Sequence, residues 1–166
     1  VKSMDLDLTV DFSSRTISGK ADFFMAEAMG GPLDLDTRDL TINTAQDAAG
    51  NAVGFELAEA DSVLGSRLRV NLPDGTEKFT LEFTTSPEAS ALQWLEPAQT
   101  AGGKHPYLFS QCQAIHARSV IPCQDTPLAR FTFNCNMTVP EDLTVVMAAA
   151  PGEKGAAEKP GMTTYN

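Results

Sequence analysis

Basic residues are scarce in this chain, and that scarcity excludes two classes of partner. The 166 residues contain 12 Lys and Arg against 22 Asp and Glu, which gives a formal net charge of -10. A nucleic-acid-binding face needs clustered Lys and Arg to neutralise phosphates. An anionic membrane surface attracts the same residue types. We therefore expect neither nucleic acid nor a membrane as a partner.

Long hydrophobic runs are missing as well, which excludes a membrane-spanning helix of about 20 apolar residues. The hydrophobic fraction of 42% and the charged fraction of 20% are ordinary for a globular protein. A chain of this length can bury about two-thirds of its unfolded surface without metals or disulfides. We therefore expect one domain over residues 1–166.

Cysteine and histidine are too few for a disulfide scaffold or a zinc site. The three cysteines, Cys112, Cys123 and Cys135, are odd in number and widely spaced, which is typical of reduced thiols in a cytoplasmic protein. Catalytic zinc usually needs three protein ligands, and an HExxH helix often supplies two of them. Only His105 and His116 are present, eleven residues apart. We expect a cytoplasmic protein with no metal ligand and no catalytic residue in this chain.

Helical periodicity is weak, whereas alternation with a period of two runs through most of the sequence. In residues 5–12 four apolar side chains alternate with Asp and Thr, and residues 16–25 repeat the pattern after the short link "SSR". This pairing predicts a β-hairpin. Residues 68–72 and 79–83 alternate in the same way around "PDGTEK", whose Asp-Gly predicts a turn between two strands.

The same pattern continues toward the end of the chain. Residues 131–139 predict a strand with Cys135 on its apolar face, and "LTVVM" predicts another after Pro140. "AAAPGEKGAAEKPG" reads as a solvated loop, and "MTTYN" as the start of a further strand. The fold class that we predict is all-β, with mainly antiparallel twisted sheets arranged as a saddle-like sandwich.

Chemically versatile side chains gather in one stretch, "HPYLFSQCQAIHARSVIPCQDTP". If this stretch is extended, Gln111 and Gln113 project from one face of a strand and offer two amides that donate and accept hydrogen bonds. The amides could equally bond neighbouring backbone or water. Cys112 and His116 would lie roughly 13 Å apart on such a strand, too far for a nucleophile pair. The glutamines can orient a ligand but cannot transfer a proton.

Three segments in order resemble the N-terminal domain of the gluzincin zinc aminopeptidases, the family of leukotriene A(4) hydrolase and aminopeptidase B. They are "LDLDTRDLTI", the block from Ser86 to Pro127, and "FTFNCNMTVPEDLTVVMAAA". The resemblance covers about Leu6 to Tyr165. It implies a saddle-shaped β domain that precedes a catalytic domain, and it places zinc and the HExxH helix in that missing catalytic domain.

The resemblance also implies a role for the "QCQ" segment. In the family this loop enters the active-site cleft, where the second glutamine holds the free amino group of a peptide substrate. That role falls to Gln113, with Gln111 and Ala114 lining the same pocket, while His116 and a possible Arg118–Asp125 pair belong to the scaffold. Some relatives also open the epoxide of leukotriene A(4). The residues that separate the two activities lie outside these 166 positions.

Two functions remain open from the sequence. One is a substrate-positioning domain of a zinc aminopeptidase, packed against its own catalytic domain and inactive alone. The other is a stand-alone, non-catalytic β module that binds a peptide or protein partner. Under the first interpretation the chain is truncated before the last strands of the domain, and we expect an unpaired strand edge where those strands would add.

Overall fold

Strands dominate this computed structural model, which describes residues 1–165. Strand makes up 53% of the chain and helix 4%, so the predicted all-β class is confirmed. Neither short helix among the described residues is long and apolar enough to cross a membrane. The elements are β1 (Ser3–Asp11), β2 (Thr16–Thr37), β3 (Thr41–Asp47), β4 (Phe55–Leu57), β5 (Ser66–Thr84), β6 (Leu92–Leu95), η1 (Pro97–Gln99), β7 (Tyr107–Ser110), η2 (Ala117–Ser119), β8 (Thr132–Pro140), β9 (Lys154–Ala156) and β10 (Met162–Tyr165).

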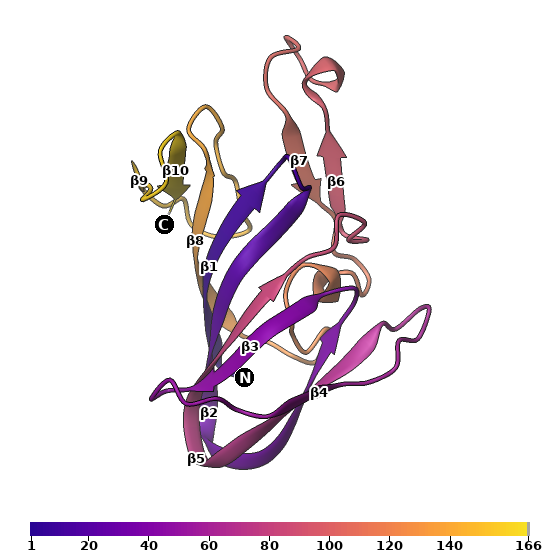
Figure 1. Ribbon diagram of the computed structural model, residues 1–166, viewed down its shortest axis with the longest axis vertical. Helices are drawn as coiled ribbons and strands as arrows, with labels where there is room; N and C mark the ends of the chain where they lie inside the picture. Colours follow the sequence, from indigo (N-terminus) through magenta and orange to yellow (C-terminus); the bar gives the residue numbers. More distant parts are fainter. Residues whose placement is uncertain (166) are drawn as a thin grey trace.

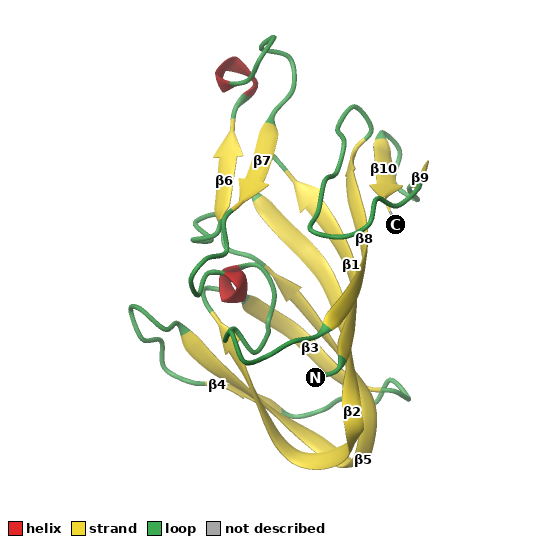
Figure 2. Ribbon diagram, turned by 180° about the vertical axis from the view of Figure 1, so that it is seen from behind, coloured by secondary structure: helices red, strands yellow, loops and turns green. Residues whose placement is uncertain are grey.

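Eight strands form one large sheet in the order β3-β5-β2-β1-β8-β10-β9, with β4 added to β5. The predicted hairpin between β1 and β2 is present, with Asp11 opposite Thr16. Every pairing in this sheet is antiparallel except that of β1 with β8, which is parallel. The hairpin of β6 and β7 stands apart and projects from one end of the molecule (Figures 1 and 2).

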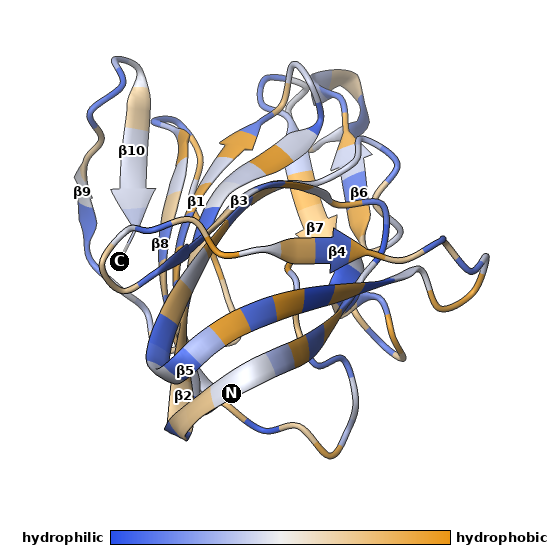
Figure 3. Ribbon diagram, turned by 60° about the horizontal axis from the view of Figure 1, so that its bottom comes forward, coloured by the Kyte–Doolittle hydropathy of each residue, from blue (hydrophilic) through white to orange (hydrophobic). Residues whose placement is uncertain are grey.

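The long strands β2 and β5 pair along almost their whole length and bend together. The prediction of a hairpin turn at "PDGTEK" is wrong, because this segment lies inside β5, where Thr76 and Lys78 still pair with β2 across a register shift. Gly31 has a φ of +86° and Gly75 one of +81°, so both strands carry a glycine where their pairing shifts register. Figure 3 shows the two strands curving side by side with alternating apolar and polar residues. β3 pairs with one half of β5 and β4 with the other, which produces the saddle shape.

The core lies on the inner face of the bent sheet and follows the predicted alternation. Leu6, Leu8 and Val10 of β1 are all buried. Phe23 and Phe79 are cross-strand partners, and their rings stack with centroids 4.6 Å apart. Aromatic pairs of this kind stabilise a sheet beyond the area that they bury.

The C-terminal strands differ from the sequence prediction in two respects. "LTVVM" does not form a strand. Leu143 and Val145 pack against the core, whereas Val146 is exposed. The segment read as a solvated loop contains the short strand β9. β10 forms as predicted and pairs with β8, and β9 pairs with β10. The sheet ends at β9, which is paired on one side only within residues 1–165, and Asn166 of "MTTYN" lies outside the described residues.

Candidate functional site

The residues predicted to bind substrate lie in an exposed loop between β7 and η2. The strand ends at Ser110, so the prediction that Gln111 and Gln113 share one face of a strand is wrong. The chain leaves the strand because residues 113–116 form a turn, and the His116 N–H closes it by donating to the Cys112 carbonyl at 2.9 Å. The peptide bond between Gln113 and Ala114 is cis.

All three predicted side chains are nevertheless brought together at the surface. Gln111, Gln113 and Ala114 are exposed, and the Gln111 side-chain oxygen accepts a hydrogen bond from the Gln113 N–H at 3.0 Å. The Gln111 amide oxygen thus binds neighbouring backbone, which was one of the two possibilities that the sequence left open. The side-chain amide of Gln113 forms no hydrogen bond with another residue of the described chain. Its NH₂ group and its oxygen are therefore both available to a ligand.

A buried ion pair anchors the far end of this loop. The Arg118 side chain is almost fully buried, and its Nε lies 3.1 Å from the Asp125 carboxylate. One terminal nitrogen donates to the Leu64 carbonyl at 2.8 Å and lies 3.4 Å from Asp36. The pair between Arg118 and Asp125 that the sequence suggested is therefore present. A buried guanidinium that is paired and hydrogen-bonded on several sides fixes the backbone around it.

The thiol and imidazole of the loop do not form a nucleophile pair. The His116 Nδ1 atom lies 2.8 Å from the Ser90 hydroxyl, and no hydrogen bond within residues 1–165 links it to Cys112. Burial, followed by the nearby Asp125 charge, raises the pKa of the Cys112 thiol above its usual value. A raised pKa leaves the thiol protonated and weakly nucleophilic at neutral pH.

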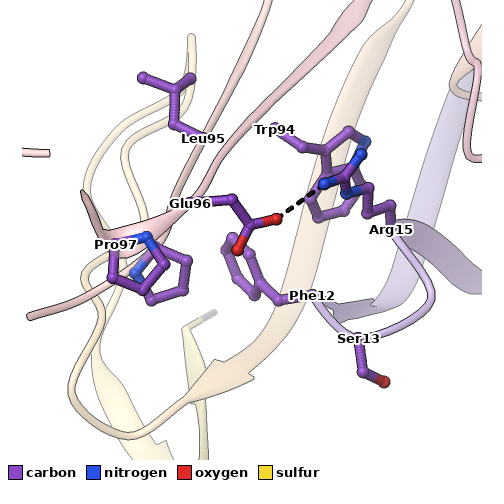
Figure 4. Close-up of a pocket in the computed structure, with 8 residues that line it drawn as sticks. Phe12, Ser13, Arg15, Trp94, Leu95, Glu96 and Pro97 are labelled. Atoms are coloured by element: carbon purple, nitrogen blue, oxygen red, sulfur yellow. Dashed lines mark hydrogen bonds and ion pairs between the residues drawn. The ribbon is translucent and has the colours of Figure 1, made fainter. Parts of the chain in front are cut away.

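The β6–β7 hairpin beside the loop is braced against the β1–β2 turn. Arg15 forms an ion pair with Glu96 at 2.7 Å, and Phe12 contacts Trp94 edge-to-face with ring centroids 5.3 Å apart. These side chains and Pro97 line a pocket of about 270 Å³, and Figure 4 shows how they lie. None of the predicted substrate-binding residues lines this pocket. The pocket therefore lies apart from the glutamine loop.

Potential metal ligands are not clustered in the part of the chain that the structure describes. No group of three His, Cys, Asp or Glu residues that could hold a metal ion occurs among the residues that the structure describes. The exposed side chains of the loop include the Gln111 and Gln113 amides, which are not usual zinc ligands. These amides can orient a charged or polar group by hydrogen bonding.

Sequence reasoning missed two residues that shape the site. Ser90 binds His116 from 26 positions upstream, and Asp36 accepts a hydrogen bond from the Asp125 N–H at 2.9 Å across 89 positions. Neither residue belongs to a local motif. Only the fold brings them to the loop, since alternation along a strand reports a face and not a partner.

These features define a β domain that presents hydrogen-bonding groups on a fixed loop. Residues 2–166 match the Peptidase M1 N-terminal domain family. The chain belongs to this family, and the resemblance noted in its sequence is confirmed.

Related proteins support the assignment over nearly the whole chain. Leukotriene A-4 hydrolase of Xenopus laevis is 44% identical over 156 residues, which cover 90% of this chain and 26% of the relative. Leucine aminopeptidase 2 of Aspergillus oryzae is 42% identical over 84% of this chain and 23% of its own length. This chain thus spans about a quarter of these relatives.

Solved structures agree. Yeast LTA4 hydrolase in complex with bestatin superimposes with a TM-score of 0.80 at 35% identity, covering 99% of this chain and 26% of that protein. An M1 zinc metallopeptidase from Deinococcus radiodurans, with a TM-score of 0.74 at 21% identity over 99% of this chain and 37% of its own, shares the fold. The predicted saddle-like β domain is thus a known domain architecture.

Proposed function

We propose that this chain is the substrate-positioning domain of a larger leukotriene A(4) hydrolase-like zinc aminopeptidase, which removes N-terminal residues from peptides. The observation that carries the proposal is the exposed side-chain amide of Gln113, which has no hydrogen-bond partner within residues 1–165 and sits on a loop held by buried side chains. The chain's family and its coverage of about a quarter of related enzymes support it.

The chemistry of the loop suits a free peptide N-terminus. The Gln113 amide oxygen can accept a hydrogen bond from an α-ammonium group, an interaction strengthened by the charge. Gln111 keeps its NH₂ group free while its oxygen holds the Gln113 N–H, and Ala114 leaves space beside the pair. A blocked N-terminus offers fewer donors, so an acceptor at this place favours unblocked peptides.

The other parts of the reaction belong outside these residues. The described side chains do not fit zinc, and we assign zinc and the general base to a catalytic domain of the parent, the partner of this domain. The three free thiols suit a cytoplasmic protein. Opening of an epoxide by the same parent is a second candidate activity, which the similarity to the Xenopus protein favours.

Reading the open reading frame past Asn166 and assaying its full product test the proposal. An HExxH motif with a distant Glu downstream, and chelator-sensitive hydrolysis of aminoacyl amides, are the expected results. Residues 1–166 alone should show no turnover and retain no stoichiometric zinc after dialysis. A stop codon directly after Asn166 would instead support the stand-alone binding module, and conversion of leukotriene A(4) by the full product would establish the second activity.

A further inference from the structure

His116 closes the turn that presents Gln113 and Ala114. Its N–H donates to the Cys112 carbonyl at 2.9 Å, and its own carbonyl accepts the Ser119 hydroxyl at 2.8 Å. Its imidazole Nδ1 lies 2.8 Å from the Ser90 hydroxyl. His116, which is half-buried, therefore forms hydrogen bonds through its backbone N–H, its carbonyl and its side chain.

Ser90 and Ala91, the two residues before β6, form hydrogen bonds with both ends of the loop. The Gln111 N–H donates to the Ala91 carbonyl at 2.8 Å, while the Ala91 N–H donates to the Ser119 hydroxyl at 3.0 Å. Ala91 and Ser119 are buried, so water does not compete for these bonds. Ser90 adds the bond to His116. Ser90 and Ala91 thus hold the loop where it begins and where it ends.

We propose that His116 is a positioning residue for Gln113, acting through its bond to Ser90. The imidazole touches no reacting group. It fixes the turn so that the Gln113 amide points outward in one place, which removes the entropy that a mobile loop would lose when substrate binds. This inference rests on the proposed function, because it assigns His116 to the same amino-group site.

Kinetics of the full-length protein test the role. His116→Phe keeps a ring but removes the hydrogen bond, and Ser90→Ala removes the partner. Each should raise KM for an unblocked peptide about 5-fold and leave kcat within about 2-fold, because a ground-state binding contact is weakened. His116→Asn retains a side-chain group able to bond Ser90 and should restore most of the affinity. His105→Phe, which replaces the other, exposed histidine, should behave as wild type.

A double-mutant cycle separates positioning from general stability. In a Gln113→Leu background His116→Phe should cause no further loss, because residues that act through one another are not additive. Additive losses, a fall in kcat alone, or no rescue by His116→Asn would overturn the proposal.

Hydrogen exchange gives a readout that does not depend on activity. In the full-length protein, His116→Phe should speed exchange of the Gln111 and His116 amides about 10-fold and leave the β2–β5 amides unchanged. Unchanged exchange at the loop would refute the positioning role. An inactive wild-type protein would refute the proposed function instead, and the exchange data would still decide whether His116 holds the loop.

Discussion

Gln113 differs from its neighbours because its side chain has no partner within the described chain, whereas Gln111 is partly engaged. In the full-length protein we expect Gln113→Leu to lower kcat/KM for unblocked peptides about 10-fold or more, since a hydrogen bond to a charged group contributes roughly 1.5–3 kcal/mol. Steady-state kinetics measure the change. Folding should be unaffected, because the side chain is exposed.

Gln93→Leu is the matched control, since Gln93 is an exposed glutamine on the adjacent strand β6. It should leave kcat/KM unchanged. Wild-type kinetics in a well-folded Gln113→Leu enzyme would return Gln113 to the surface role that the sequence left open.

One buried and one half-buried thiol, Cys123 and Cys135, make stability fall at alkaline pH. Burial, ahead of the Asp125 and Asp36 charges, raises the pKa of Cys123 to about 12, and burial, ahead of Asp7, raises that of Cys135 to about 11. The ordinary pKa of a cysteine thiol is 9.0. The unfolded chain therefore loses these protons first as pH rises above 9, so the stabilisation is complete below pH 9 and disappears toward the folded-state pKa values.

The free energy of unfolding should consequently fall between pH 9 and 11 by up to about 1.4 kcal/mol per pH unit for each thiol. Urea titrations at several pH values measure this slope. Cys123→Ala should remove about half of it. An identical slope in that variant would show that other groups cause the alkaline loss.

At the scale of elements, β1 and β2 approach closely enough to require glycine at position 19. A Cβ atom there would lie 2.0 Å from the Asp7 carbonyl oxygen, so Gly19→Ala forces the two strands apart. We expect a loss of about 3 kcal/mol of folding stability, within the range for overpacking. Gly54→Ala meets nothing closer than 4.0 Å and should be neutral or slightly stabilising. Chemical denaturation compares the two, and equal stabilities would contradict the close approach.

Sequence pattern predicted the strands better than it predicted their connections. Alternation located β1, the start of β2 and β8, because each has one buried face. The Asp-Gly at Asp74 and Gly75 misled the prediction, because a turn signal reports local backbone freedom and not the partner strand. Opposite it lies Gly30, where a Cβ would be 2.2 Å from the Asp74 carboxylate. This close approach of β2 to β5, at the place where the sequence predicted a hairpin turn, can be seen only in the folded sheet.

The hydrogen-bonding groups of the candidate site could be predicted from the sequence, but the contacts that hold its loop in place could not. The amides of Gln111 and Gln113 follow from residue type, and their role came from a family resemblance. The bond from Ser90 to His116 could not be read from the chain, because no local periodicity joins residues 26 positions apart. The turn that carries Gln113 is closed locally by His116 and Cys112, but the bonds from Ser90 and Ala91 that hold its ends are long-range and leave no local sequence pattern.

At the scale of the whole molecule, one apolar face continues into the glutamine loop. Tyr107 and Phe109 of β7 are 55% and 44% exposed, and their rings lie 6.1 Å apart. Gln111 follows two positions after Phe109, directly beyond the end of β7. We expect the catalytic domain of the parent to cover this face. Separated from that domain, it leaves adjacent exposed aromatic rings, which favour association.

The isolated chain should therefore self-associate at high concentration, and more strongly at high salt, because salt screens the repulsion between molecules of net charge -10. Sedimentation velocity at low and high salt measures this. Replacing both Tyr107 and Phe109 with Ser should abolish association, whereas replacing the separately exposed Leu128 and Val146 with Ser should not. If association persists without the aromatic pair, and the Lys154–Ala156 amides become protected, the edge strand β9 is the contact and this prediction is wrong.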